Sequence, residues 1–323
     1  MKNLAVSMLA MASIAAMVSC SSNNDPVDEV GNGEKVEIKL NAGVGAITTK
    51  ATPLTELKNN NITLLRQDRS STPSSWASYT VGKYTVGADG SIPLTGDQKY
   101  YNNDETPLNS YFLGVYPQIA TDPTSNIITF SGQTGEEDIL CSQVYDAGTK
   151  ILQTDATNSK MKFDHMLSQV QIKLVATASA KTAFGKIKKI IIKDMPKTLD
   201  LSLDNRAITA SNTPNNADIT IYDNSTGENI DAITIPAKFL LPGLGGENAT
   251  DLKIAIETEK YNTGATQSIN ILGIKTNVSG TDEYGTLAGY LHNIELTFND
   301  NISITTEVSS IQNGGSGNGN IEN

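Results

Sequence analysis

The sequence has 323 residues, with 24 Lys and Arg against 35 Asp and Glu, which gives a formal net charge of −11. This acidity excludes a nucleic-acid-binding protein that depends on attraction to phosphates. Aromatic residues make up 6% of the chain, and the apolar residues are dispersed among Thr, Ser, Asn and 26 Gly, a composition that favours strands over a helical bundle. No apolar run reaches the length of about 18 residues that a membrane-spanning helix needs, so we expect no integral membrane domain.

The first 19 residues have the pattern of an export signal. Lys2 supplies a positive charge, residues 4–18 supply an apolar stretch, and Ser19 stands before Cys20. The pattern resembles a bacterial lipoprotein signal, in which the cysteine is lipidated and becomes the first residue of the mature chain. We therefore expect a signal peptide over residues 1–19 and lipidation at Cys20; the alternative is an ordinary secretory signal that ends near Ser19.

Lipidation of Cys20 would leave Cys141 as the only other cysteine, so no disulfide could form within the chain. Cys141 lies in an apolar run, where a single cysteine usually acts as a small buried hydrophobic residue. Stability must then come from burial of a core.

The segment that follows Cys20 has two parts. Residues 21–34 are polar and show no periodicity, which is typical of a tether. Residues 35–42 alternate strictly and place one apolar row on a single face: Val36, Ile38, Leu40 and Ala42. The Gly- and Thr-rich residues 43–53 predict a loop that a protease could reach, so residues 20–50 hold a tether and a first strand.

Two groups of short strands follow, and their spacing suits antiparallel sandwiches, one over residues 51–160 and the other over residues 161–311. Just after this predicted boundary, residues 163–170 have partly helical spacing. Residues 312–323 are rich in Gly and Asn and predict a flexible tail. The predicted strands are 62–66, 79–86, 110–116, 126–130, 139–144, 170–176, 187–192, 199–203, 219–222, 233–241, 252–257, 269–274, 287–298 and a last strand from residue 302.

The sequence offers little for catalysis. His165 and His292 are its only histidines, so a zinc site or a histidine-activated nucleophile has few residues to use, and we expect both to be structural. The adjacent carboxylates of Glu136, Glu137 and Asp138 could form a paired site, but neighbouring carboxylates on a loop are usually solvated. We expect no catalytic residue, no metal and no cofactor, and hence no enzyme.

Several segments, in their order along the chain, resemble the fimbrillin family of Bacteroidetes, which forms the subunits of type V pili. The resemblance implies an all-β fold of two tandem transthyretin-like antiparallel β-sandwich domains, export as an outer membrane lipoprotein, and assembly into a cell-surface fimbrium that serves adhesion. The late aromatic residue of the family is replaced here by residues 310–313. The segments that carry the resemblance are Cys20 and the residues before it, the strand 36–42 followed by Lys50 and Ala51, and residues 111–117, 163–168 and 289–297.

The resemblance also implies how the subunit would be processed. A trypsin-like protease would cut after Lys50 and make Ala51 the new N-terminus. Loss of the strand with Val36, Ile38, Leu40 and Ala42 would uncover an apolar groove with unpaired backbone groups, which another strand can fill. The donor would be the C-terminal row of a neighbouring subunit, and such head-to-tail donation does not close on itself, so it builds a filament. The donor row is Ile302, Ile304 and Val308.

The implied partners are other fimbrial subunits, the processing protease, and the outer membrane through the lipid of the precursor. Stalk, tip and anchor roles all stay open at this point. The alternative function is a surface lipoprotein that keeps its first strand, does not polymerise, and binds a glycan or a host ligand. Trp76 and Tyr79, exposed on a loop, would be its natural platform.

Overall fold

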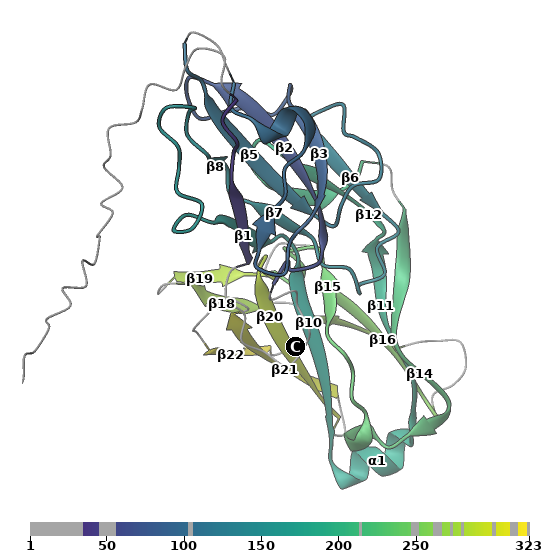
Figure 1. The fold of residues 1–323 in the computed structure, drawn as a ribbon. Coiled ribbons are helices and arrows are strands. Elements are labelled where there is room, and N and C mark those ends of the chain that lie inside the picture. The colour runs from purple at the N-terminus through teal and green to yellow at the C-terminus, as the bar shows by residue number, and fades with distance from the viewer. Residues whose placement is uncertain are drawn as a thin grey trace, which may run out of the picture. The chain divides into compact units, whose positions relative to one another are not determined.

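The computed structural model describes residues 35–44, 56–102, 106–212, 215–246, 252–260, 267–271, 274–278, 281–298, 302–310 and 316–321. In this part of the chain the fold is predominantly β, with one short α-helix and two 3-10 turns (Figure 1). The elements are β1 (Leu40–Val44), β2 (Asn61–Arg69), β3 (Thr80–Thr85), β4 (Ser91–Ile92), η1 (Gly96–Lys99), β5 (Asn109–Tyr116), β6 (Ile127–Ser131), β7 (Leu140–Ser142), β8 (Tyr145–Asp146), β9 (Met161–His165), β10 (Ser168–Ala176), α1 (Ala178–Phe184), β11 (Ile187–Pro196), β12 (Thr198–Ser202), β13 (Ile208–Ala210), β14 (Asn216–Glu228), η2 (Ile230–Ala232), β15 (Lys238–Leu240), β16 (Leu252–Thr258), β17 (Gln267–Ile271), β18 (Lys275–Val278), β19 (Thr281–Tyr284), β20 (Tyr290–Phe298), β21 (Ile302–Ser310) and β22 (Ser316–Ile321).

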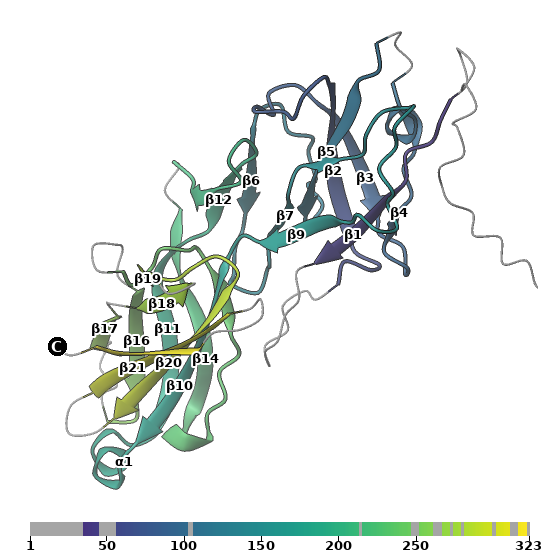
Figure 2. The same ribbon diagram turned by 90° about the vertical axis from the view of Figure 1, so that its left-hand side faces the viewer.

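The N-terminal half of the described chain forms one sheet with the strand order β3-β2-β5-β7-β9-β1-β4, and β8 also pairs with β5 (Figure 2). Its pairs are antiparallel except for β1 and β9, which run parallel. Neighbouring residues of β2 and β5 are buried on opposite faces: Leu64 and Phe112 pack on one face, and Leu65 and Leu113 on the other. Burial on both faces explains why these strands are continuous apolar runs rather than alternating ones.

Each face of this sheet has its own core. The N-terminal cluster holds Ile38, Leu40, Leu57, Ile62, Leu64, Tyr84, Val86, Ile92, Leu94, Tyr101, Phe112, Leu140, Tyr145, Ala147, Met161 and Phe163. The middle cluster holds Leu65, Trp76, Tyr111, Leu113, Val115, Ile119, Ile128, Phe130, Ile139, Cys141, Met166, Leu167, Leu199, Leu201, Leu203 and Phe239. Because the middle cluster includes residues of β6 and β12, the small sheet β13-β12-β6 covers this second face.

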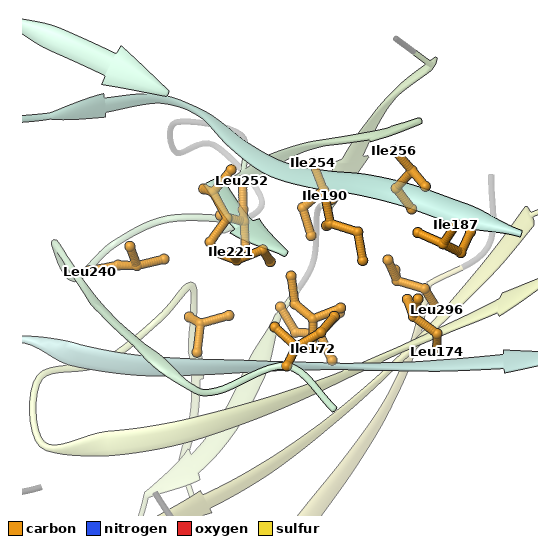
Figure 3. Close-up of a cluster of buried hydrophobic side chains, with 14 of the residues drawn as sticks. Ile172, Leu174, Ile187, Ile190, Ile221, Leu240, Leu252, Ile254, Ile256 and Leu296 are labelled. Carbon is orange, nitrogen blue, oxygen red and sulfur yellow. The ribbon is translucent and has the colours of Figure 1, made fainter. Parts of the chain in front are cut away.

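The C-terminal half has two sheets that pack face to face, with the orders β15-β10-β20-β21-β22 and β14-β11-β16-β17. Figure 3 shows the apolar side chains between them, where Ile172 and Leu174 of β10 meet Ile190 of β11 and Ile254 of β16. The helix α1 closes one end of this core. Its Phe184 ring contacts the ring of Phe298 edge to face, with the ring centres 5.4 Å apart.

The structure differs from the sequence predictions in several segments. Residues 163–170 are not helical: β9 ends and β10 begins there, and the buried residues of their short connection imitate helical spacing. Gly43 and Val44, predicted to lie in a loop, belong to β1 and pair with β9. Part of the tail predicted to be flexible, Ser316–Ile321, forms β22 on the edge of β21, since backbone pairing needs no apolar side chain.

The division of the chain into residues 51–160 and 161–311 stays a prediction. β9 begins at that boundary, and it pairs with β7 and β1 in the N-terminal sheet. A strand next to a boundary can join either side, and its pairing partner cannot be read from periodicity.

Gly114 of β5 is a sensitive point of this packing. A Cβ added there would overlap the ring of Phe163, which is fully buried and has no room to move. We expect Gly114→Ala to lower the free energy of unfolding by about 1–3 kcal/mol, as overpacking of a core does. Gly43→Ala is the matched control, because its Cβ would meet only the Lys160 side chain at an ordinary 3.7 Å. Denaturant unfolding of both variants measures this difference. An equal decrease in the free energy of unfolding of the two variants would contradict the prediction.

Candidate functional site

The predicted removable strand lies in the N-terminal cluster. Ile38 and Leu40 are 4% and 2% exposed, and Val36 and Ala42 are partly buried against the same cluster. The four side chains of the alternating row therefore contribute to one core. Glu37 and Lys39, which alternate with them, are exposed.

A neighbouring segment, residues 90–101, holds one side of this strand and is called the strap here. The Ile38 amide donates to the Lys99 carbonyl at 2.8 Å, and the Tyr101 amide donates to the Val36 carbonyl at 3.0 Å. Along the other side, β1 pairs in parallel with β9 over Ala42–Val44. The strand is thus held by antiparallel bonds over most of its length and by a short parallel pairing at its end.

The strap is anchored to the rest of the sheet independently of the strand. The guanidinium of Arg66 in β2 donates to the Asp97 carbonyl at 3.0 Å and is paired with Asp68 at 2.9 Å. The buried Gln98 side chain donates to the Thr80 carbonyl at 3.0 Å and accepts from the Tyr84 hydroxyl at 3.0 Å. These buried bonds do not involve residues 36–42, so the strap has its own attachment to β2 and β3.

Charge contributes little to holding the strand. Lys99 forms an ion pair with Glu37 at 2.6 Å, and this hydrogen bond raises the pKa of Lys99 above its ordinary value. Both side chains are at least a third exposed, and exposed ion pairs contribute little to stability. Apolar burial and backbone pairing therefore dominate the strand's attachment.

The predicted donor residues lie in β21, which belongs to a different sheet from β1. β21 is antiparallel to β20 along its whole length, with Ile302 opposite Phe298, Ile304 opposite Leu296 and Val308 opposite His292. β22 pairs with the other edge of β21. In this chain, then, the predicted donor strand and the predicted removable strand are not brought together.

Three predicted site residues, Cys20, Lys50 and Ala51, lie outside the described residues. Lipidation and proteolytic processing therefore stay predictions.

The aromatic platform predicted for a ligand-binding lipoprotein is wrong for Trp76. This side chain is 1% exposed and packs in the middle cluster, and its backbone amide donates to the Asp204 carboxylate at 2.6 Å. Tyr79 is partly buried, and its hydroxyl donates to the Ser125 carbonyl at 2.6 Å. The sequence predicts an exposed loop around Trp76. In the structure, apolar side chains of the sheet β13-β12-β6 share the middle cluster with Trp76 and bury it.

The prediction that Glu136, Glu137 and Asp138 are solvated is wrong for Asp138, whereas Glu136 is exposed even though it pairs with Lys238. Partial burial raises the pKa of Glu137, but hydrogen bonds from the Thr134 amide at 2.9 Å and the Thr134 hydroxyl at 2.8 Å lower it, and the net effect is a lowered pKa. Asp138 is buried and hydrogen-bonded to His165.

The two histidines and Cys141 have the structural roles predicted for them. His165 is buried, with its Nδ1 2.7 Å from Asp138 Oδ2. His292 is fully buried in β20, and its Nε2 accepts the Leu287 amide at 3.0 Å. Burial lowers the pKa of His292 to about 4 and raises the pKa of the Cys141 thiol to about 12, so both stay neutral at physiological pH.

Within the described ranges, no cluster of three or more His, Cys, Asp and Glu side chains could hold a metal ion. A helix long and apolar enough to cross a membrane is not found among those residues either.

The fold and the strand geometry together describe an all-β protein with an apolar strand held by a separately anchored strap. The sequence profile of the family described as fimbrillin-like matches residues 35–313, so the chain belongs to this family. The predicted resemblance to fimbrillins is thereby confirmed. A search of curated protein sequences finds no match.

Solved structures share this fold at low identity. The chain is similar to candidate cell adhesion proteins from Bacteroides ovatus (14% identity, TM-score 0.56, covering 86% of this chain and 98% of that one) and Bacteroides uniformis (13%, 0.55, 85% and 99%). It is similar also to one from Parabacteroides distasonis (11%, 0.50, 85% and 96%). The likeness spans nearly the whole of each of these structures.

Membership of the fimbrillin-like family implies a fimbrial protein at the cell surface, associated with other fimbrial subunits. It also implies a structural rather than an enzymatic role.

His292 predicts a pH dependence of stability. Its pKa is about 4 in the folded chain and about 6.5 unfolded, so below pH 6.5 the unfolded chain binds a proton that the folded chain does not. Its neutral form therefore contributes stability above pH 6.5 that is lost as the pH falls towards 4, by at most about 1.4 kcal/mol per pH unit. We expect His292→Gln, which keeps an acceptor for Leu287, to unfold with a shallower pH dependence in this window. Urea titrations from pH 4 to 7 give the free energy of unfolding of the wild type and of His292→Gln. If this free energy changes with pH equally in both, the assignment is refuted.

Proposed function

We propose that this protein is a structural subunit of an adhesive cell-surface fimbrium. In this proposal it is exported as an outer membrane lipoprotein lipidated at Cys20 and cut after Lys50 by a trypsin-like protease. It then polymerises by strand exchange, with two tandem transthyretin-like sandwiches as its body. The observation that carries the proposal is the attachment of residues 36–42, buried in the N-terminal cluster beside a strap with its own anchors.

The energetics support replacement rather than simple loss of this strand. Burying one Ile or Leu side chain is worth about 1.5–3 kcal/mol, and the row holds two that are almost fully buried and two more that are partly buried. A domain's whole stability is only about 5–15 kcal/mol. Removal of the strand would therefore be costly unless another strand took its place, and the independently anchored strap supports the view that the acceptor edge would persist.

The donor row has the apolar side chains that the groove beside the strap would accept. Ile302, Ile304 and Val308 recur at even spacing, as do the apolar residues of the first strand, so both rows place their apolar groups on one face of an extended chain. A donated strand would satisfy the amide and carbonyl groups of the strap and of β9 as well as filling the cluster. Since donor and acceptor lie in different sheets of one chain, donation between copies would be head to tail and would extend into a filament.

The first test is the intact mass of the protein sheared from its native cells. We expect a chain that begins at Ala51, and we expect Lys50→Gln to retain residues 36–42 and to give monomers only. Lys58→Gln is the matched control, because Lys58 is an exposed lysine just beyond the predicted cut. A lipidated chain that begins at Cys20 would contradict the proposal and would favour an anchor or a surface lipoprotein that does not polymerise.

The donor row can be tested separately from cleavage. We expect Ile304→Asp to be cut normally but to give no ladder of oligomers after trypsin-like treatment, because a charge cannot enter an apolar groove without a partner. Thr305→Asp, one residue along and so on the opposite face of the strand, should still form the ladder. Ladders of equal length from both variants would remove the assigned role of the donor row. Circular dichroism before cleavage confirms that each precursor is folded.

A further inference from the structure

A small hollow lies where the loop between β6 and β7 meets β14 and β15. Its volume is about 240 Å³. The polar residues that line it supply both donors and acceptors: Gln133, Glu136, Lys197, Asp218, Thr220 and Lys238.

Lys238 is the unusual member of this group. Its side chain is only 7% exposed, and it pairs with Glu136, whose own side chain is 64% exposed. An ammonium group has three N–H donors, so a single carboxylate does not use its full capacity. The buried cation is therefore fixed by the fold, while the anion that neutralises it reaches in from solvent.

The loop that carries Glu136 is held in a defined conformation. The Gln133 amide donates to the Lys197 carbonyl at 3.0 Å, and the Phe239 amide donates to the Gly135 carbonyl at 2.8 Å. Gly135 has φ of +84°, a left-handed conformation that favours glycine, and it packs against the Lys238 stem. These bonds fix the loop's backbone just before Glu136, and the exposed Glu136 side chain can still turn away.

We propose that this hollow binds a small sugar acid, and that Glu136 is an internal carboxylate which the ligand's carboxylate replaces on Lys238. The exchange conserves charge: one carboxylate leaves Lys238 for water, and another takes its place. The Gln133 side-chain amide, the Thr220 hydroxyl and the Asp218 carboxylate would form hydrogen bonds with the sugar hydroxyls. Because Asp218 is also paired with Lys193, it is already ionised and able to accept; that pairing lowers its pKa.

The site also fits the electrostatics of the chain. The protein has a net charge of −11, which opposes the approach of anions in general. The ammonium groups of Lys238 and Lys197 both line the hollow, so a carboxylate that displaces Glu136 meets two cations there. Exchange of one carboxylate for another gains little by itself, so affinity must come from the hydroxyl contacts, and we expect a dissociation constant of about 1 mM.

The test uses the full chain titrated with sodium glucuronate by isothermal titration calorimetry or NMR. We expect two substitutions to change affinity in opposite directions. Lys238→Met should abolish binding, because it removes the cation while keeping the stem that packs on Gly135. Glu136→Gln should tighten binding by about two- to fivefold, because it removes the internal competitor. Lys83→Met, which breaks an exposed ion pair with Asp122 outside this hollow, should leave the affinity unchanged.

Glucose and acetate separate the two halves of the ligand. Glucose lacks the carboxylate and acetate lacks the ring, so both should bind at least tenfold more weakly than glucuronate. Acetate that binds as well as glucuronate would overturn the assignment to a sugar acid. Binding that survives Lys238→Met, or no binding to either the wild type or Glu136→Gln, would overturn the site itself. The titration needs neither cleavage at Lys50 nor polymerisation, so its outcome is independent of the proposed fimbrial assembly.

Discussion

The N-terminal sheet depends on how the first strand completes its core. Ile38 and Leu40 enter the N-terminal cluster from a strand that, among the described residues, lies between the strap and β9. The strap keeps its attachment through Arg66 and Gln98, which bond to its backbone and to β2 and β3. In the proposed strand exchange, the strap would serve as the acceptor edge and residues 36–42 as the strand that leaves.

The other face of the same sheet supports this arrangement. Leu65, Leu113 and Cys141 pack with Leu199 and Leu201 of β12, so the central strands are covered without any contribution from residues 36–42. Loss of the first strand would open one core while the middle cluster stayed closed. A sheet with two separate cores can tolerate an incomplete state more readily than one with a single core, because its central strands keep half of their burial.

Much of this architecture could be predicted from the sequence where one physical signal dominates. Strict alternation identified the strand around Ile38, and an apolar run identified the buried Cys141. The errors arose where tertiary contacts decide. Trp76 is buried by strands more than 100 residues away, and Asp138 is matched by His165 from another strand, neither of which periodicity can show.

The helix α1 was missed although local signals mark both of its ends. Thr177 accepts the Ala180 amide at 3.2 Å as an N-cap, and Gly185 with φ of +70° ends the helix. A capping residue followed eight residues later by a glycine is a pattern that predicts this helix. No comparable local signal exists for the Lys238 hollow, because its residues come from the β6–β7 loop, the link between β11 and β12, β14 and β15, which only the folded chain brings together.

Electrostatics limits the kinds of contact that could hold copies of this chain together. The segment from Ala51 onward has 273 residues with 20 basic and 30 acidic side chains, so neighbouring copies repel each other at neutral pH. Most ion pairs among the described residues are at least partly exposed and contribute little. Any stable assembly must therefore gain its free energy from apolar burial and from backbone pairing, the two interactions that attach residues 36–42 in the single chain. In the proposed assembly the acidic surface and the apolar strand would have complementary effects: the charge would oppose random association, and the strand would permit association through backbone pairing and apolar burial.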